Sequence, residues 1–383
     1  MSGEQRPQKA LLVAALQGDA PRPPAFAPLY LDLYLEPLRR QRLAEVYAEL
    51  AEGDSSLRLS HSEEIEAQLE AFARACAVFT ERPAWLPTRL GSGREALETV
   101  KVTFPTGKCL RHTPRRREPE DLLAPYDASV PDVWDAGDLP EPEDLRRQPV
   151  ASAQELIDAG KTELPAGAVE RFGDSYLLTA SLGSPMWHAY SRLGFLGMMV
   201  ALRERPEVLE ALCELSLRQS LSQAQALRHA GVPCIYVEEC LSSADLISPE
   251  DYLKVAYPPT RDLIHGLKQL GLRVIYYYCG SPAGRLEHLG ALEADALAFE
   301  ESKKGFVVDL GQLRAELGAK QLLFGNTSAV LLRDGSPERI AADVRRQWDA
   351  AGPRLVVSMG SPATPDTPPA KLDALARGAV ELT

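Results

Sequence analysis

The chain has 383 residues, of which 45% are apolar and 25% are charged, as in ordinary folded proteins. Its 54 acidic side chains outnumber its 42 basic ones, which gives a formal net charge of −12 at pH 7. A chain this acidic is not expected to hold nucleic acid or to lie on an anionic membrane surface.

Six cysteines are scattered along the chain, and none forms a C-x-x-C pair. This spacing argues against a zinc finger, a redox motif or a disulfide framework, and it suits the reduced cytoplasm. The apolar run at 11–16 is too short for a signal peptide, and the longest one, at 194–202, is too short to cross a membrane. We therefore expect a cytoplasmic protein.

The N-terminal part is predicted to contain a short helix, a proline-rich loop at 21–24, a strand at 25–29 and a helix at 38–50. Residues from about 54 to 170 differ in character. A helical pattern at 63–78 is followed by a β-like piece at 100–104 and then by a charged, proline-rich stretch. We interpret 54–170 as an inserted subdomain that elaborates a single domain comprising residues 1–383.

From about residue 175 onward, short apolar runs alternate with amphipathic helical stretches. The predicted strands lie at 176–180, 234–237, 274–278, 296–299, 321–324 and 355–358. The helices between them begin at prolines and end at glycines, as from Pro206 to Gly231 and from Pro249 to Gly271. A spacing of about 25 to 40 residues between strands is typical of βα units.

Together with 25–29, these strands predict an α/β fold, a (β/α)8 barrel, with its eighth strand expected somewhere in 100–175. An open doubly wound sheet is the alternative, but no G-x-G-x-x-G follows the first strand and no P-loop motif occurs. Functional residues of a barrel lie at the carboxyl ends of its strands. The residues that follow the predicted strands are therefore the candidates for a functional site.

Carboxylates and thiols follow several of these strands. Glu238 and Glu239 follow one, and Glu300 and Glu301 follow another. Because neighbours in a strand point to opposite faces, one member of each pair is expected to face the barrel mouth, where it can act as an acid, a base or a metal ligand. Cys279 is either a metal-bound thiolate or a small buried residue.

Further candidates come from other residue types. His188 is the best placed histidine of this half because it follows a strand end. Asn326 and Ser361 follow the last two strands, and Lys303 follows the Glu300 pair. The three tyrosines at 276–278 alternate in direction, so at least one ring is expected to point into the barrel.

Five short motifs occur in order in the C-terminal half: residues 278–280 (Tyr-Cys-Gly), 294–297, 323–326 (Leu-Phe-Gly-Asn), 335–338 and 358–368. In this order they resemble the uroporphyrinogen decarboxylase superfamily. The resemblance implies a distorted (β/α)8 barrel with one of two activities. One is decarboxylation of a porphyrinogen without a cofactor, and the other is corrinoid-dependent methyl transfer with a zinc-activated thiol.

The residues that match each branch's motifs compare the two activities, and the first comparison counts against the decarboxylase. The decarboxylases carry an arginine-rich motif after the first strand, whereas the matching stretch here, 25–32, contains no arginine. The zinc methyltransferases carry a His-x-Cys-Gly motif and a second Cys near the C-terminus. Cys279 matches the first motif, but Tyr277 and Ser361 stand in the positions of the other two ligands. The resemblance therefore implies a zinc site that is absent or rebuilt from Cys279, Glu239 and Glu300.

We predict an enzyme, a corrinoid (cobalamin)-dependent methyltransferase, that acts on a small molecule with a corrinoid protein as partner. The residues expected to take part in catalysis are Glu239, Glu300 and Tyr278. Those expected to bind substrate are Tyr236, His188, Asn326, Lys303 and Ser361, and the candidate metal ligands are Cys279 and Glu239. The alternatives are a decarboxylase of another carboxylated substrate and a non-catalytic binding barrel. A homodimer is one candidate for the oligomeric state.

Overall fold

The structure is a computed structural model that describes residues 7–51, 59–91, 93–94, 100–103, 109–112, 139–303 and 305–382. Its centre is one parallel sheet with the strand order β1-β4-β5-β6-β7-β8-β9. These strands are β1 (Trp85–Thr88), β4 (Leu177–Gly183), β5 (Cys234–Glu239), β6 (Arg273–Tyr278), β7 (Ala296–Phe299), β8 (Leu323–Phe324) and β9 (Leu355–Val356). Because adjacent strands are parallel, their carboxyl ends all lie on one side of the sheet.

The segment 25–27 joins the two edges of this sheet. On one side Ala27 N donates to Val357 O (3.0 Å), just after β9. On the other side Ala84 N, just before β1, donates to Phe26 O (2.7 Å). The segment thus takes the eighth position and closes the sheet, which confirms the predicted distorted (β/α)8 barrel.

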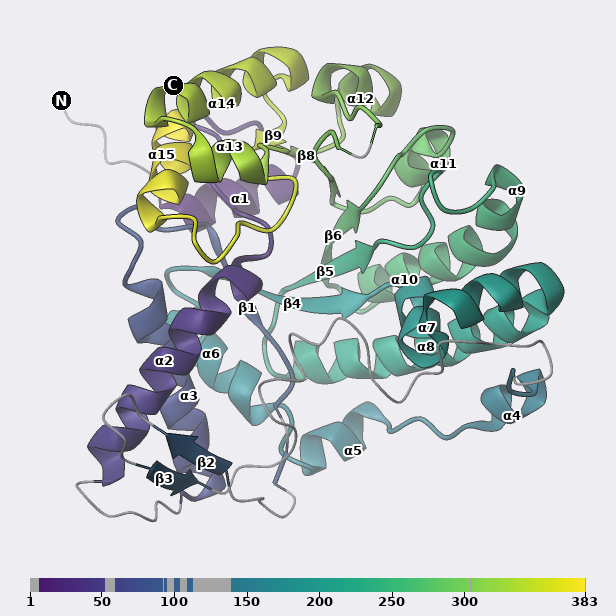
Figure 1. Ribbon diagram of the computed structural model, residues 1–383, viewed down its shortest axis with the longest axis horizontal. Coiled ribbons are helices and arrows are strands. Elements are labelled where there is room, and N and C mark those ends of the chain that lie inside the picture. Colours follow the sequence, from purple (N-terminus) through teal and green to yellow (C-terminus); the bar gives the residue numbers. More distant parts are fainter. Residues whose placement is uncertain are drawn as a thin grey trace.

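Helices surround the strands (Figure 1). The long ones are α2 (Leu31–Ala51), α3 (His61–Cys76), α7 (Pro185–Glu204), α8 (Pro206–His229), α10 (Tyr257–Gln269), α14 (Pro337–Ala351) and α15 (Pro369–Val380). Shorter ones are α1 (Gln8–Leu16), α4 (Pro142–Arg147), α5 (Ala153–Asp158), α6 (Glu163–Phe172), α9 (Pro249–Asp251), the π-helix η3 (Tyr252–Ala256), α11 (Leu286–Ala291), α12 (Leu310–Leu317) and α13 (Ala329–Asp334). No helix in the described ranges is both long and apolar enough to cross a membrane.

Local capping explains why the predicted helix starts are accurate. Ser248 and Ser336 each accept a hydrogen bond from a backbone amide in the first turn of the helix that follows, and a proline occupies the next position. Helix α8 likewise begins at Pro206 and ends shortly before Gly231. These signals depend on a few neighbouring residues, so they can be read from sequence.

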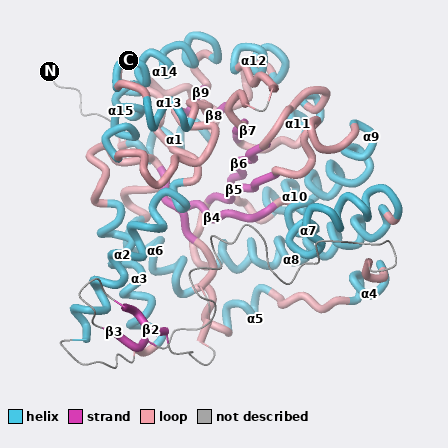
Figure 2. The backbone as a smooth tube through the Cα atoms, viewed as in Figure 1, coloured by secondary structure: helices cyan, strands magenta, loops and turns pink. Residues whose placement is uncertain are grey.

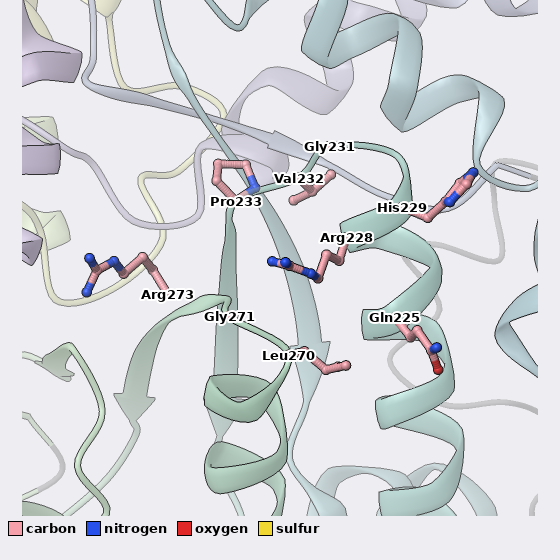
Figure 3. A pocket seen from close by; sticks show the side chains of 9 residues that line it. All are labelled: Gln225, Arg228, His229, Gly231, Val232, Pro233, Leu270, Gly271 and Arg273. Atoms are coloured by element: carbon pink, nitrogen blue, oxygen red, sulfur yellow. The ribbon is translucent and has the colours of Figure 1, made fainter.

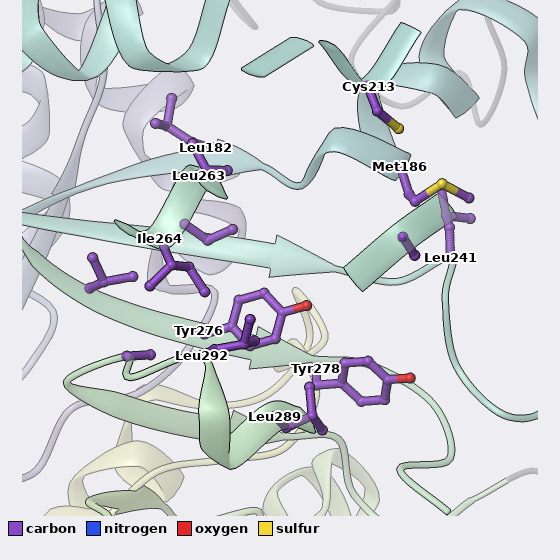
Figure 4. Close-up of a cluster of buried hydrophobic side chains, with 14 of the residues drawn as sticks. Leu182, Met186, Cys213, Leu241, Leu263, Ile264, Tyr276, Tyr278, Leu289 and Leu292 are labelled. Atoms are coloured by element: carbon purple, nitrogen blue, oxygen red, sulfur yellow. The ribbon is translucent and has the colours of Figure 1, made fainter. Parts of the chain in front are cut away.

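Alternate side chains of the strands face two different apolar environments. The interior cluster of the barrel includes Cys234, Tyr236, Ile275, Tyr277 and Phe324. The outer cluster, between the strands and the helices, includes Ile235, Val237, Tyr276 and Tyr278. Figure 4 shows part of this outer cluster, in which Tyr276 and Tyr278 lie beside leucines. The direction of each strand residue therefore decides whether it reaches the barrel mouth.

Helix α1 closes the amino end of the barrel. Its apolar side chains belong to the interior cluster: Leu11, Leu12, Ala15 and Leu16. Arg354, directly before β9, donates to Ala15 O (3.2 Å), and Arg273, at the start of β6, donates to Leu16 O (3.5 Å). The carboxyl ends of the strands form the opposite end, which we call the mouth.

The one barrel strand that the sequence did not locate lies outside the range in which it was expected. It is β1, not a segment of 100–175, and it contains Pro87, which weakens a strand signal. The β-like piece at 100–104 overlaps β2 (Val100–Thr103), which pairs antiparallel with β3 (Cys109–His112) in a hairpin apart from the barrel (Figure 2). The predicted strand at 25–29 forms only a bridge at Phe26. Most of the charged, proline-rich stretch at 115–142, namely 115–138, lies outside the described residues.

Candidate functional site

Strands β5 and β6 bring polar and aromatic side chains into the mouth of the barrel. The interior-facing positions are Tyr236, Glu238 and Cys240 along β5 and its loop, and Tyr277 and Cys279 along β6. The register places Glu238 beside Tyr277 on the adjacent strand. Tyr30, which follows the segment 25–27, packs against the same side chains. We call these residues, with Tyr30, the mouth cluster.

A hydrogen bond between Tyr30 and Glu238 forms the polar centre of the mouth cluster. Tyr30 Oη donates to Glu238 Oε1 at 2.8 Å. Burial raises the pKa of the Glu238 carboxyl, and the hydrogen bonds from Tyr30 and Cys240 offset this rise only in part. Burial also raises the pKa of Tyr30, which therefore remains a protonated donor. Glu238 is thus suited to hold a proton and to give it to a bound substrate.

Three tyrosine rings surround this hydrogen bond. The ring of Tyr30 stands edge-on to those of Tyr236 and Tyr277, with centroids 6.2 and 5.3 Å away, and the latter two rings stack at 6.0 Å. Tyr30 has a φ of 55°, in the left-handed region that a tyrosine rarely adopts. Its contacts with two rings and one carboxyl hold it in this strained conformation, which is a feature common at functional sites.

One thiol contacts the carboxyl group of Glu238, and a second thiol lies next to the first. Cys240 Sγ donates to Glu238 Oε1 at 3.4 Å, and Cys279 lies within hydrogen-bonding reach of Cys240. The Cys279 thiol, burial and the Glu238 charge together raise the pKa of Cys240 well above its ordinary value. Cys240 is therefore a thiol at neutral pH, a hydrogen-bond donor and a poor nucleophile.

A second polar group consists of Glu300, Lys303 and Ser361, and we call it the lysine site. Lys303 Nζ forms an ion pair with Glu300 Oε1 and donates to Ser361 Oγ at 3.0 Å. Glu300 Oε2 accepts from Gly280 N at 2.9 Å. The Glu300 side chain is 3% exposed and that of Lys303 is 34% exposed. The ion pair with Glu300 thus holds the ammonium group of Lys303 in place.

Tyr277 connects the mouth cluster to the lysine site. Its ring contacts Tyr30, and its hydroxyl donates to Gly360 O at 2.9 Å. Gly360 directly precedes Ser361 of the lysine site. The two polar groups are therefore neighbours in one mouth.

Glu239 and Tyr278, both predicted to take part in catalysis, lie on the outer face of the sheet. Glu239 is fully buried, burial raises the pKa of its carboxyl, and its Oε1 accepts from Leu241 N at 2.6 Å. Tyr278 Oη donates to Ser242 O at 2.9 Å. Both contacts hold the loop after β5 from outside the barrel. The sequence left open which glutamate and which tyrosine face the mouth, and this placement does not favour a catalytic role for Glu239 and Tyr278.

Tyr30, Glu238 and Tyr277 were not among the site residues predicted from sequence. The alternation of strand side chains was the signal that could have found the last two. It groups Tyr236 with Glu238, and Tyr277 with Cys279, on one face. Tyr30 follows a segment with no strand periodicity, and no local pattern marked it.

The structure places the five predicted substrate-binding residues in four different surroundings. Lys303 and Ser361 meet in the lysine site, and Tyr236 belongs to the mouth cluster. Asn326 lies beside the lysine site, but its amide donates to two backbone oxygens of the loop after β7, at 3.2 and 3.3 Å. His188 is half-buried on α7, where burial lowers its pKa. No hydrogen bond or ion pair among the described residues joins His188 to the mouth cluster.

The donor set does not fit the zinc ion that the resemblance implies. Cys279 lies inside the barrel and Glu239 outside, so the predicted pair of ligands is not brought together. Glu300 is already paired with Lys303. Within the described part of the chain, no three His, Cys, Asp or Glu side chains are grouped so that they could hold a metal ion.

A groove of about 680 Å³ lies at the amino ends of β5 and β6, away from the mouth (Figure 3). Its polar lining includes Gln225, Arg228 and His229 of α8. Arg228 and His229 occupy the last turn of that helix, where positive side chains offset the carbonyl ends of the backbone. This end of a barrel serves stability, so the groove is not the candidate site.

An α/β barrel with polar groups gathered at the carboxyl ends of its strands is the architecture of an enzyme. Residues 132–381, more than half of the chain, match the uroporphyrinogen decarboxylase (URO-D) family. The chain therefore belongs to this family.

The relatives that are similar to this chain include a decarboxylase and a methyltransferase. A uroporphyrinogen decarboxylase of Geobacter metallireducens is 29% identical over 49% of this chain and 51% of its own length. A methylcobamide:CoM methyltransferase, MtbA of Methanosarcina mazei, is 23% identical over 40% of this chain and 44% of its own length. The chain thus matches about half the length of these curated relatives. A solved methyltransferase from Methanosarcina mazei has the same fold over 98% of this chain and 99% of its own, with a TM-score of 0.64 and 16% identity.

Proposed function

We propose that this protein transfers a methyl group between a small substrate and a corrinoid carried by a partner protein. The observation that supports this most is the Glu238 carboxyl, whose pKa burial raises and which Tyr30 holds at the barrel mouth. A proton donor among aromatic rings suits a reaction in which a methyl group leaves an oxygen or nitrogen atom. The fold shared with a solved methyltransferase agrees with this proposal.

The proposed step is a nucleophilic displacement at the methyl carbon. The bond from carbon to the substrate heteroatom breaks, its electron pair stays on that heteroatom, and the methyl group passes to the corrinoid as co-substrate. Glu238 gives its proton to the leaving heteroatom, and Tyr30 then stabilises the carboxylate that remains through its hydrogen bond. In the reverse direction the same carboxylate accepts the proton.

Exposed apolar side chains follow several strands at the mouth. They are Leu33 at the start of α2, Trp187 at the start of α7, Leu246 after β5, Val307 after β7 and Val330 at the start of α13. A contiguous apolar patch marks a surface that binds a large ligand or a partner protein, whereas single exposed apolar side chains are ordinary. A corrinoid and its carrier as co-substrates would require these side chains to form one such patch.

A cobalamin assay tests the proposal. The purified protein is mixed with cob(I)alamin or methylcobalamin and with a panel of methyl ethers, methylamines and methyl thioethers, and the cobalamin absorbance is followed. At least one donor is expected to change the spectrum at a rate that depends on enzyme concentration. The Glu238→Gln variant is expected to lose this activity, and Glu287→Gln, at an exposed position on α11, is the control. No change with any donor would remove the support for methyl transfer.

Basic side chains near the mouth favour decarboxylation as the second candidate. Arg89 directly follows β1, and its electrostatic neighbours include Arg39, Arg40 and Glu36 of α2. Guanidinium groups are the usual partners of substrate carboxylates, and a curated decarboxylase is among the relatives. Release of carbon dioxide from a carboxylated substrate, lost in Arg89→Gln, would establish this activity. A protein with neither activity would be the non-catalytic barrel.

A further inference from the structure

The lysine site fixes a positive charge where the ends of three strands meet. Glu300 follows β7, Ser361 follows the segment after β9, and Gly280, which donates to Glu300 at 2.9 Å, follows β6. Lys303 Nζ contacts both Glu300 and Ser361, and these two partners are 3% and 5% exposed. A lysine held by two buried partners from different strands differs from a lysine that is simply solvated.

The ammonium group of Lys303 has an N–H group left with which it can donate a hydrogen bond at the mouth. An ammonium group has three N–H donors. Glu300 and Ser361 use two of them, and about a third of the Lys303 side chain, 34%, is exposed. The remaining donor can therefore contact an electron-rich or negatively charged atom of a substrate.

The positive charge of Lys303 lies beside positions at which the zinc-dependent members of the superfamily carry metal ligands, according to the resemblance. Ser361 stands where the zinc methyltransferases carry their second Cys, and Tyr277 stands where they carry His. Cys279, the one matching ligand, directly precedes the Gly280 amide that donates to Glu300. The single charge on Lys303 therefore lies among the residues that would surround a divalent ion.

We propose that Lys303 replaces the metal ion as a built-in cation. Its fixed charge repels a divalent ion from the site, and its free N–H binds the heteroatom or anionic group of the substrate while charge develops there. The catalytic half of this inference rests on the proposed function. The exclusion of metal rests on the contacts of the lysine site alone.

Zinc binding by three proteins tests the exclusion without any assay of activity. They are the wild type, a double variant (Tyr277→His with Ser361→Cys), and a triple variant that adds Lys303→Ala. After dialysis against a chelator, each is titrated with Zn²⁺, and bound zinc is measured by elemental analysis. We expect the triple variant to bind about one equivalent, at least about 100-fold more tightly than the double variant, because only the triple variant lacks the repelling charge and has a Glu300 carboxylate that no ammonium group occupies. The wild type is expected to bind none at the same concentration.

Two results would overturn the proposal: one equivalent of zinc in the purified wild type, or equal affinities in the double and triple variants. Circular dichroism and thermal melting establish that each protein is folded. If the triple variant does not fold, the single variant Lys303→Ala replaces it, with Lys320→Ala, at an exposed distant position, as its control. Methyl transfer by Lys303→Ala is expected to fall, and added ethylammonium to restore part of it, whereas failure of this rescue would refute the cation's role.

If no methyl transfer is found in any protein, the proposed function fails while the zinc titration still decides whether Lys303 excludes a metal. If zinc enters the double variant as readily as the triple variant but methyl transfer is observed, the inference fails and the proposed function stands.

Discussion

Removal of the Tyr30 hydroxyl should shift the protonation of Glu238. Tyr30→Phe keeps the ring, which contacts Tyr236 and Tyr277, and deletes the donor that lies 2.8 Å from Glu238 Oε1. A hydrogen bond to a charged group contributes about 1.5 to 3 kcal/mol. This bond favours the ionised carboxyl, so its loss raises the pKa of Glu238 beyond the rise that burial already causes.

The size of the shift follows from this energy. Since about 1.4 kcal/mol corresponds to one pH unit, the titration of Glu238 should move upward by about one to two pH units. If Glu238 is the proton donor, activity falls as pH rises through its pKa, so the alkaline limb of kcat/KM should move to higher pH by the same amount. Carboxyl-labelled NMR measures the titration directly, without any activity. Tyr34→Phe is the matched control, because Tyr34, on α2, donates its Oη hydrogen to Thr367 O in the loop before α15 and not to Glu238.

An unchanged titration, or a shift to lower pH, would refute this reasoning. Either result would mean that the Tyr30 hydroxyl does not stabilise the carboxylate of Glu238. The titration of Glu238 could also shift while the alkaline limb of the pH profile of kcat/KM stays in place. This result would confirm the hydrogen bond from Tyr30 and would remove Glu238 as the proton donor.

Three further outcomes are expected. Burial raises the pKa of the Glu239 carboxyl in the folded state. The contribution of this carboxyl to stability therefore falls as the pH rises above the ordinary carboxyl range. Glu239→Gln should thus raise the melting temperature more at pH 8 than at pH 4. A Cβ at Gly360 would lie 2.5 Å from a backbone nitrogen, so Gly360→Ala should lower the unfolding free energy by about 1 to 3 kcal/mol, whereas Gly290→Ala, 3.3 Å from its nearest neighbour, should not. Because its pKa is raised, Cys240 should react with iodoacetamide at pH 7.5 at least about tenfold more slowly than free cysteine. An equal rate would contradict the raised pKa of this thiol.

The helices and most barrel strands were predictable because their signals are local. Proline and serine residues mark the start of α14, and glycine marks the end of α8, where a few neighbours determine the backbone. Strand β1 was not predictable, because it has only four residues and one is Pro87. Its place is determined by pairing with β4, far away in sequence.

The candidate site was predictable in its location and only partly in its residues. Position at a strand end pointed to the mouth, and Lys303, Ser361 and Tyr236 do lie there. Glu239, the predicted catalytic residue, lies on the outer face and Glu238 on the inner one, because one residue along a strand changes the face. The contact of Tyr30 with Glu238 joins residues 208 positions apart, and such a contact depends on closure of the barrel.

The most direct test of the proposed function follows a labelled methyl group in metal-free protein. A ¹³C-methyl donor that is active in the cobalamin assay is mixed with cob(I)alamin and the chelator-treated enzyme, and the label is located by NMR. The account predicts that the label appears on cobalamin without added metal, and that Glu238→Gln slows its appearance by about 100-fold or more. A label that stays on the donor, or a rate that Glu238→Gln leaves unchanged, would contradict the account.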